Sequence, residues 1–422
     1  MSVAIEVKTL TDKQKRRLEK DLTIELTHPK IGTIIAYRVS DDDQLVYIPY
    51  DYGRKHGFLP PSGSSFPRIS PSAKFVGELY PEQKNKRKEA IDNLNSIGTT
   101  IMSLNCGFGK TITAINIALK IRLRALVIVT RLLLIDQWQK AINNFASDVQ
   151  VHILLPDKPY LHVEADIFVI NAINIKKFNH GFLQKFGLVI VDECHLIMST
   201  ILSQGMQFLT PRYLLALSAT PYRYDDGDKL INLHFGKARV TCELKRKHIV
   251  RVVRTDFKPT IEFNEKRKKI NWNLVLNSLS EMKARNALIC DITIEILTNE
   301  PDRNILILTK RVEQVQVLEA EMKKKGVSSV TTLFGSKRDF DRTAKILVAC
   351  IQKCSVGFDH PILDTLILAC DTDAYFIQTL GRVFRKKDTT PLIVDIVDNH
   401  ASLHRHFLLR KKVYTSIGGV FS

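Results

Sequence analysis

The chain has 422 residues, of which 45% are hydrophobic, and its formal net charge at pH 7 is +18. This length gives room for about two to four domains with cores of normal composition. No apolar run reaches the ~18–20 residues of a membrane-spanning helix, so we expect no membrane partner. The excess of lysine and arginine favours a polyanionic partner such as nucleic acid, and a charged but merely solvated surface is the alternative.

The seven cysteines are scattered along the chain, and none of them forms a C-x-x-C pair. We therefore expect neither structural disulfides nor a zinc site. The N-terminal sequence MSVAIEVKTLTDKQKRRLEK is charged and lacks the apolar core and cleavage site of a secretion signal. These features predict an intracellular protein in a reducing compartment.

Residues 1–74 are expected to form an N-terminal accessory region and linker. The segments IIAYRV and QLVYIPY predict two strands around the turn-forming sequence SDDD. The stretch 58–71 is rich in proline, serine and glycine, which predicts a linker. This region carries no motif that we can assign. It either grips a substrate or simply packs against the rest of the chain.

Within residues 75–240, a short apolar run leads into the glycine-rich sequence NCGFGKT, and a helical pattern follows it. This is the arrangement of a P-loop, in which backbone N–H groups and the helix N-terminus surround a phosphate. We expect Lys110 to reach the β- and γ-phosphates of ATP, and the Thr111 hydroxyl to hold Mg²⁺. A glycine-rich turn before an ordinary helix is the alternative, because Leu104 stands where the pattern has its first glycine. The residues expected to cradle the nucleotide are Cys106, Gly107, Phe108, Gly109, Lys110 and Thr111.

Continuous apolar strands then alternate with helical segments, as in ALVIVT, DIFVI, LVIV and YLLAL. This alternation predicts a parallel sheet covered on both faces, with its site at the carboxyl ends of the strands. After LVIV, Asp192 is expected to hold Mg²⁺ and Glu193 to act as the general base. A pair of acidic residues that merely ends a strand is the alternative. After YLLAL, the small residues Ser218, Ala219 and Thr220 are expected to couple this site to a moving neighbour.

Residues 241–285 are strongly basic and are expected to be a connector, which either contacts a phosphate backbone or is solvated. Residues 286–422 repeat the strand–helix alternation without a P-loop, which predicts a second α/β domain. Arg382 and Arg385 are three positions apart, so on a helix they would share one face. We expect them to act as arginine fingers on the γ-phosphate. A basic helix that binds nucleic acid or solvent is the alternative.

The ordered set of these motifs resembles the superfamily 2 helicases and translocases, over about 79–396. The phrases LSATPYRYDDGDKL and VGFDHPILDTLILA are most similar to the branch of the XPB-type repair helicases and type III restriction translocases, and within it to the helicases of large DNA viruses, such as the poxvirus late-transcript-release helicase and its iridovirus relatives. Residues 104–111, 125–138, 192–195, 218–220, 347–361 and 378–385 look like motifs I, Ia, II (in its DECH form), III, V and VI.

The resemblance implies two RecA-like domains in tandem that use ATP and Mg²⁺ and hold nucleic acid. It adds an adenine-reading role for Gln83, whose amide can donate and accept at once. It also implies nucleotide contacts by Gly357, Asp359 and Gln378, and nucleic-acid contacts by Thr130, Arg131, Asn171 and Cys350. Three departures from the family pattern are Leu104 in motif I, Cys194 in the variable position of motif II, and Cys350 where threonine is more common.

The sequence therefore predicts an ATP-dependent DNA helicase or translocase, with a function in viral transcription. A duplex translocase that releases transcripts without unwinding, an RNA helicase and a non-enzymatic nucleic-acid-binding remnant are the alternatives. The expected partners are DNA rather than RNA, and transcription or replication proteins. The expected location is the host cytoplasm or the virion for a viral protein, and the nucleus otherwise.

Overall fold

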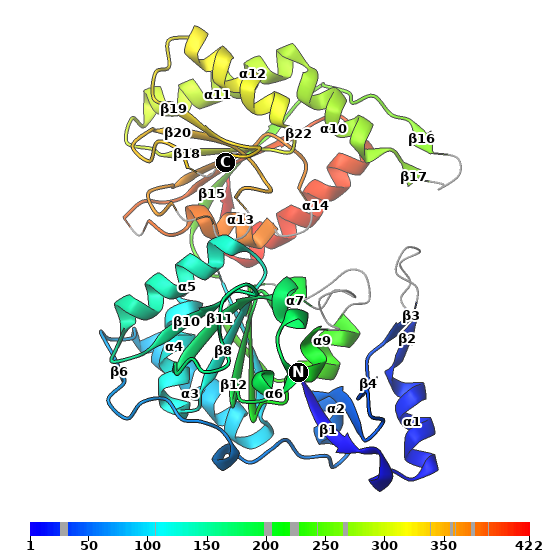
Figure 1. Ribbon diagram of the computed structural model, residues 1–422. Helices are drawn as coiled ribbons and strands as arrows, with labels where there is room; N and C mark the ends of the chain where they lie inside the picture. Colours follow the sequence, from blue (N-terminus) through cyan, green and yellow to red (C-terminus); the bar gives the residue numbers. More distant parts are fainter. Residues whose placement is uncertain are drawn as a thin grey trace. The chain divides into compact units, whose positions relative to one another are not determined.

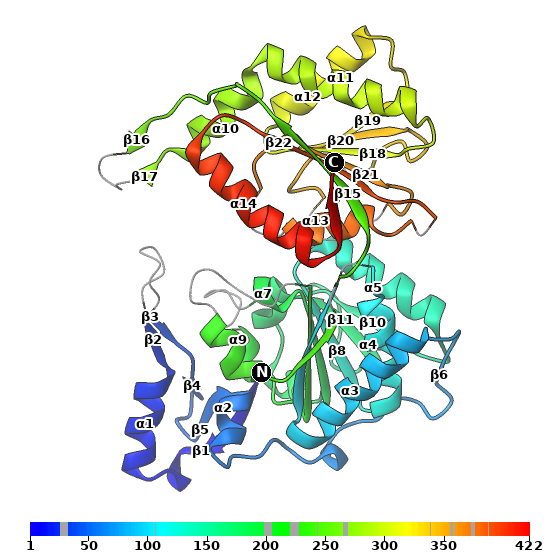
Figure 2. The same cartoon turned by 180° about the vertical axis from the view of Figure 1, so that it is seen from behind.

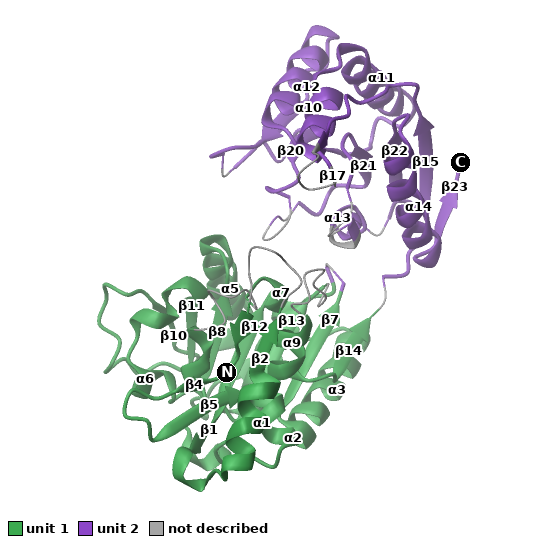
Figure 3. Ribbon diagram, turned by 90° about the vertical axis from the view of Figure 1, so that its right-hand side faces the viewer, with its two compact units in different colours: residues 1–104, 108–242 green, residues 105–107, 243–422 purple. Residues whose placement is uncertain are grey.

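The protein was analysed as a computed structural model that describes residues 1–25, 33–105, 107–197, 205–219, 228–242, 244–264, 269–337, 339–354, 358, 360–372, 376–386 and 388–422. The chain forms two compact units (Figure 3). The first comprises residues 1–104 and 108–242, and the second comprises 105–107 and 243–422. None of the described helices is long and apolar enough to cross a membrane.

A seven-stranded parallel sheet forms the centre of the first unit (Figure 1). Its strands are buried on both faces, which explains why they appear in the sequence as continuous apolar runs rather than alternating ones. The predicted strands of this region are all present. In spatial order, the strands are β10 (Val151–Leu154), β11 (Ile167–Asn171), β8 (Ala125–Val129), β12 (Leu188–Asp192), β13 (Tyr213–Ser218), β7 (Thr99–Leu104) and β14 (Arg239–Cys242).

Helices cover both faces of this sheet. Helices α3, α4 and α5 lie together on one face, and α7 and α9 pack on the other (Figure 1). The second face also receives the N-terminal region. The helices of the unit outside that region are α3 (Pro81–Ile97), α4 (Lys110–Ile121), α5 (Leu132–Phe145), α6 (His180–Leu183), α7 (Cys194–Ile197) and α9 (Asp228–Phe235), with 3-10 turns at Gly63–Ser65, Ala172–Lys177 and Met206–Phe208.

The N-terminal region is a small α/β layer that shares the hydrophobic core of the first unit. The Ser2 amide donates to the Leu209 carbonyl at 2.7 Å, and the Tyr50 hydroxyl donates to the Arg212 carbonyl at 2.5 Å. The strands predicted before residue 52 are present, and β1 and helix α1 join them. The elements are β1 (Ser2–Glu6), α1 (Asp12–Leu22), β2 (Thr23–Glu25), β3 (Thr33–Ile35), β4 (Arg38–Val39), β5 (Leu45–Pro49) and α2 (Tyr50–Lys55), with a 3-10 turn at Val7–Thr9.

The stretch 58–71, predicted to be a linker, lies against the first unit instead. Ile69 is 2% exposed, and its amide donates to the Arg122 carbonyl at 3.1 Å. The Arg124 amide donates to the Pro67 carbonyl at 2.8 Å. The prolines and glycines of this stretch therefore shape a packed surface segment. Short strands β6 (Lys74–Phe75) and β9 (Ala146–Ser147) pair just beyond it.

The second unit contains another parallel sheet, as predicted, and this sheet has seven strands. In spatial order, its strands are β19 (Val330–Leu333), β20 (Ile346–Cys350), β18 (Ile305–Thr309), β21 (Thr365–Leu368), β22 (Leu392–Val397), β15 (His248–Arg254) and β23 (Gly419–Phe421). A two-stranded ribbon of β16 (Phe263–Asn264) and β17 (Lys269–Ile270) stands apart from this sheet.

Two separate cores flank the second sheet. Helices α11 and α12 pack on one face, and α13 and α14 pack on the other (Figure 2). Successive residues of β18 pack into opposite cores. Leu306 and Leu308 belong to the core with α13, whereas Ile305 and Ile307 belong to the core with α11. The helices of this unit are α10 (Trp272–Glu281), α11 (Lys283–Asn299), α12 (Val312–Lys324), α13 (Phe376–Val383) and α14 (Ala401–Ser416).

Part of the basic stretch 241–285 is not a connector. Strand β15 lies between β22 and β23 and pairs with both in parallel. Val250 is fully buried in the core, whereas Arg251 lies at the surface and pairs with Glu295 of α11 at 2.9 Å. The valines of HIVRVV therefore outweigh its arginines in determining the local structure.

Candidate functional site

The P-loop joins the end of β7 to the start of α4. Gly107 and Gly109 have φ angles of 84° and 90°, in the left-handed region that favours glycine. Gly109 is also the N-cap of α4, and a Cβ atom there would overlap the Nε2 atom of Gln83. A side chain at position 109 would therefore be strained by both the backbone and its surroundings. Cys106 lies outside the described residues.

Leu104 occupies the last position of β7 and is fully buried. Its side chain therefore belongs to the core rather than to the loop, which explains how a leucine can stand at this position. Its carbonyl accepts a hydrogen bond from the Lys110 ammonium at 3.0 Å. Lys110 and Thr111 form the first turn of α4, where the helix N-terminus favours an anion.

Gln83 connects helix α3 to the P-loop. Its side chain is 7% exposed, and both ends of its amide are engaged. Oε1 accepts from the Tyr80 amide at 2.9 Å, and Nε2 donates to the Phe108 carbonyl at 2.6 Å. The structure thus gives Gln83 a role in holding the P-loop. Its contact with adenine stays a prediction.

Asp192 is the last residue of β12, and its carboxylate is held by two donors. The indole Nε1 of Trp138 donates to Oδ2 at 2.9 Å, and the Glu193 amide donates to Oδ1 at 3.0 Å. Trp138 is 1% exposed and comes from α5, far away in the sequence. Sequence reasoning missed this contact, because an apolar helix position gives no sign of a polar partner.

Burial and the neighbouring carboxylate of Glu193 raise the pKa of Asp192 to about 6. The Trp138 hydrogen bond and the Lys110 ammonium act in the opposite direction. Two adjacent carboxylates in a buried position are stabilised by a cation. The carboxylate of Asp192 and the hydroxyl of Thr111 are hard oxygen ligands of the kind that Mg²⁺ prefers. The donors of this site therefore fit the expected metal.

Glu193 adopts a φ angle of 50°, which is uncommon for a residue other than glycine. Its Oε2 atom lies 3.5 Å from Nδ1 of His195, and the same nitrogen lies 2.9 Å from the Ser218 hydroxyl. All three side chains belong to the carboxyl ends of β12 and β13, which are adjacent strands. A positive φ angle in a residue other than glycine is a strained backbone conformation, and such strain is frequent at functional sites.

The expected coupling segment begins at Ser218, the last residue of β13. Ser218 is fully buried, and it pairs in register with Ser103 of the P-loop strand β7. Its hydrogen bond to His195 joins the predicted coupling segment directly to the DECH sequence. Ala219 follows at the strand end, and Thr220 lies outside the described residues. The coupling function itself stays a prediction.

The expected nucleic-acid contacts of the first unit lie at one edge of its sheet. Thr130 and Arg131 follow β8, and Asn171 ends the adjacent strand β11. Arg131 is exposed and is the N-cap residue of α5. Asn171 has a local structural role, because its Oδ1 accepts from the Ile173 amide at 3.2 Å and caps a 3-10 turn. Whether these residues contact nucleic acid stays a prediction.

Arg382 and Arg385 do not share a helix face, contrary to the sequence-based argument. Arg382 lies in α13 and donates to the Phe358 carbonyl, whereas α13 ends at Val383, before Arg385. The guanidinium of Arg246 explains where the helix ends. It donates to the carbonyls of Phe384 and Lys386, and to that of Thr389 at 2.7 Å. These contacts hold the segment after α13 in a non-helical path.

The remaining predicted residues of the second unit receive little structural detail. Gly357 and Asp359 lie outside the described residues, and the side chain of Gln378 in α13 is likewise not described. Cys350 ends β20, is 4% exposed, and has its sulfur 3.9 Å from the Thr309 hydroxyl. Its thiol therefore faces the interior, so a nucleic-acid contact at this position would involve the backbone.

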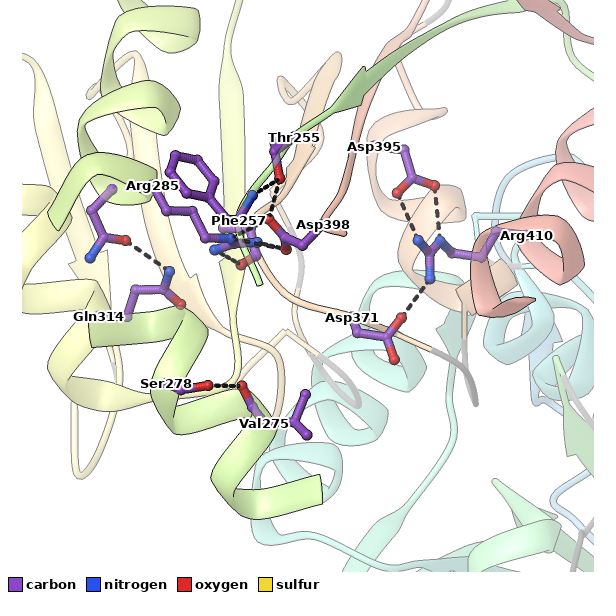
Figure 4. Close-up of polar contacts among 12 residues, drawn as sticks. Thr255, Phe257, Val275, Ser278, Arg285, Gln314, Asp371, Asp395, Asp398 and Arg410 are labelled. Carbon is purple, nitrogen blue, oxygen red and sulfur yellow. Dashed lines mark hydrogen bonds and ion pairs between the residues drawn. The ribbon is translucent and has the colours of Figure 1, made fainter. Parts of the chain in front are cut away.

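Two buried ion networks in the second unit were also missed by sequence reasoning (Figure 4). Arg410 of α14 pairs with Asp395 of β22 and with Asp371 after β21, each at 2.8 Å. Arg285 of α11 pairs with Asp398 at 2.9 Å. The sequence contained one sign of these networks. Asp395 interrupts the apolar strand LIVDIV, and a buried charge requires a partner. Its partner, however, cannot be identified from the sequence.

The fold and the site define a nucleic-acid-dependent ATPase of the helicase type, with a P-loop and an Asp-Glu pair on one parallel sheet and a second such sheet after it. The family described as "Type III restriction enzyme, res subunit" matches residues 77–223. The chain is 38% identical to the protein named "Putative helicase 161L" of Invertebrate iridescent virus 6, over 100% of this chain and 99% of that protein. The chain belongs to the superfamily 2 helicases and to their group from large DNA viruses.

Other similar proteins agree with this assignment. The protein named "Putative helicase 055L" of Frog virus 3 is 31% identical over 88% of this chain and 85% of its own length. "Transcript termination protein A18" of Yaba-like disease virus is 25% identical over 76% and 73%. Among solved structures, S. cerevisiae Dbp5 bound to RNA and ADP BeF3 is similar in fold, with a TM-score of 0.55, 15% identity, and 82% of this chain and 94% of that chain covered. This structural likeness confirms the tandem RecA-like fold.

Proposed function

We propose that this protein is an ATP-dependent DNA helicase or translocase that uses Mg²⁺ and acts in viral transcription. One observation carries the ATPase part of the proposal. Asp192 and Glu193 end a strand of the sheet that also presents the P-loop, and Lys110 of that loop is close enough to lower the pKa of Asp192. A bound cation, a phosphate and a general base can therefore meet at one sheet edge.

The residues of the first unit take distinct roles in this proposal. Lys110 binds the β- and γ-phosphates, and Asp192 and Thr111 hold the metal. Mg²⁺, when bound, neutralises charge on the phosphates and on the leaving oxygen. Glu193 orients the attacking water and accepts its proton. Gln83, Gly107 and Gly109 keep the loop in shape around the phosphates.

In the second unit, we propose that Arg382 and Arg385 stabilise the charge that develops on the γ-phosphate. Gly357, Asp359 and Gln378 are proposed to add nucleotide contacts. These roles are supported by the position of the residues within motifs V and VI of the family. The two arginines do not lie on one helix, because α13 ends at Val383, before Arg385.

The choice of nucleic acid rests on the charge of the chain and on its relatives. The net charge of +18 fits any polyanion. Likeness to a type III restriction enzyme subunit and to transcript termination protein A18 favours DNA, and a function in transcription in the host cytoplasm or virion. Likeness to A18 also supports the second candidate, a translocase that releases transcripts without unwinding. The fold shared with RNA-bound Dbp5 keeps an RNA helicase as the alternative.

The decisive experiment is steady-state ATPase activity without nucleic acid and with single-stranded DNA, duplex DNA or single-stranded RNA, at one fixed salt concentration. We expect stimulation by DNA, and loss of all activity in Lys110→Ala. Stimulation by RNA alone would replace the proposed substrate. Hydrolysis that survives in Lys110→Ala would contradict the assignment of the site. A strand-displacement assay on the active protein then separates a helicase from a translocase.

A further inference from the structure

Trp138 lies between the expected nucleic-acid contact at Arg131 and the expected metal site at Asp192. Helix α5 begins at Leu132, directly after Arg131, where nucleic acid is expected. Trp138 is about two turns further along the same helix, roughly 10 Å away at the ~1.5 Å rise of an α-helix. Its indole is buried and donates to the carboxylate of Asp192, where the metal is expected.

The start of α5 is accessible, whereas the Trp138 contact is enclosed. The side chains of Leu132 and Leu133 in the first turn are 67% and 53% exposed. Trp138 and Asp192 are 1% and 7% exposed. One short helix therefore connects a surface that can receive a ligand to a carboxylate inside the ATPase site. Helix α5 also packs against α4, which carries Lys110 and Thr111.

Among the described contacts of the Asp192 carboxylate, two groups donate hydrogen bonds. The indole of Trp138 is the donor that comes from outside the Asp192–Glu193 segment. The other donor is the adjacent Glu193 amide, which moves with Asp192 itself. A movement of α5 would therefore change the hydrogen bond from Trp138 and leave the hydrogen bond from the Glu193 amide. Such a change would rotate the Asp192 carboxylate. Hydrogen bonds to a metal-binding carboxylate set its orientation and thereby the affinity for the metal.

We propose that Trp138 is a positioning residue that links Asp192 to helix α5, so that nucleic acid at the first turn of α5 and Mg²⁺-nucleotide at Asp192 strengthen each other's binding. This inference rests on the proposed function. By thermodynamic linkage, the factor by which DNA improves nucleotide binding must equal the factor by which nucleotide improves DNA binding. Removal of the indole N–H should reduce both factors together.

The test compares Trp138→Phe, which keeps an aromatic ring without the N–H, with Trp272→Phe as the matched control. Trp272 stacks on His406 in the second unit, with ring centroids 5.1 Å apart. Dissociation constants are measured for a fluorescent, non-hydrolysable ATP analogue with Mg²⁺, with and without a single-stranded DNA oligonucleotide. The Mg²⁺ concentration for half-saturation is measured in parallel.

We expect the parent and Trp272→Phe to bind the analogue at least about fivefold more tightly with DNA, within the usual range of coupling. In Trp138→Phe, this factor should fall to about one, and half-saturation should need roughly 10–100-fold more Mg²⁺. Its affinity for DNA without nucleotide should equal that of the parent. Coupling of parental size in Trp138→Phe would overturn the inference. A parent that binds neither ligand would instead overturn the proposed function.

A second measurement does not depend on the stability of Trp138→Phe. The chain has two tryptophans, so Trp272→Phe leaves Trp138 as the sole source of indole fluorescence. DNA added without nucleotide should change the emission of Trp138, and Mg²⁺ with the unlabelled analogue should change it as well. Emission that responds to the analogue and not to DNA would contradict a link through α5.

Discussion

Glu193 is the side chain on which the proposed chemistry depends most. Its carboxylate follows the expected metal-binding position in the sequence, and its backbone φ angle is 50°. Glu193→Gln keeps the shape of the side chain but cannot accept a proton. We expect kcat to fall by about 10²–10⁴-fold, while Mg²⁺-ATP binding persists. Equilibrium nucleotide binding measures the affinity, and steady-state kinetics measures kcat. Equal losses of affinity and kcat would show that Glu193 has a structural role rather than a role in proton transfer.

Arg385 provides a second prediction about a single side chain. Loss of an arginine finger typically costs about 10³–10⁵ in rate. Arg385→Ala should therefore bind ATP and yet barely hydrolyse it. Lys386→Ala is the matched control, because Lys386 is adjacent but pairs with Asp364 at 2.9 Å within the second unit. Single-turnover hydrolysis compares the two variants, and a normal rate in Arg385→Ala would remove this residue from the reaction.

Among the elements, helix α14 is fixed to its sheet by a buried ion network. Arg410 is 4% exposed and bridges Asp395 and Asp371, and the Tyr414 hydroxyl donates to Asp395 at 2.9 Å. Asp371 follows β21 and precedes α13, which carries Arg382. The network therefore fixes the position of α14 relative to the segment that leads into motif VI.

Arg410→Met should destabilise the second unit by about 3–5 kcal/mol, because it leaves the buried carboxylate of Asp395 without its cation. Arg251→Met is the control, since Arg251 and Glu295 form a surface pair with side chains 36% and 48% exposed. That pair is worth about 0–1 kcal/mol. Urea unfolding followed by a probe in the second unit measures both changes. Losses of similar size in the two variants would mean that burial of the network does not determine its strength.

The same elements show how far the sequence could predict the structure. The central strands of both sheets follow from continuous apolar runs, whereas the strands β10, β14, β19 and β23 were not predicted. The P-loop and the DECH sequence follow from local spacing. The contact between Trp138 and Asp192 could not be predicted, because it joins residues that only the folded sheet brings together. The end of α13 before Arg385 was missed for the same reason, since Arg246 is remote in the sequence. The place of β15 between β22 and β23 could not be predicted either, because only the folded sheet brings these segments together.

At the scale of the whole molecule, a buried histidine beside Met1 gives the first unit a dependence on pH. His234 is 2% exposed, and its Nδ1 lies 2.8 Å from the Met1 carbonyl. Burial, followed by the nearby N-terminal amine, lowers the pKa of His234 to about 3. The folded pKa is thus below the unfolded value of ~6.5. The stabilising contribution is present above pH 6.5 and is lost as the pH falls towards 3.

We expect this residue alone to cost about 2 kcal/mol of stability between pH 7 and pH 5, at ~1.36 kcal/mol per pH unit. His234→Gln removes the titrating group and keeps an N–H donor for the Met1 carbonyl. The free energy of unfolding of the parent and the variant is measured across this range. The difference between the two curves isolates His234 from other groups, and parallel curves would contradict the assignment.

The attachment of residues 1–55 has a consequence for how this protein evolves. The Tyr50 side chain fills the space above Gly98 that any Cβ atom would need, and its hydroxyl donates to the carbonyl of Arg212, the residue directly before β13. The N-terminal layer and the central sheet of the first unit share one hydrophobic core, so we expect them to unfold as one cooperative unit. We expect that this layer cannot be transferred alone between relatives, because it must match the sheet surface on which it packs. Its sequence and that of the ATPase are expected to change together, even though the two share no chemistry.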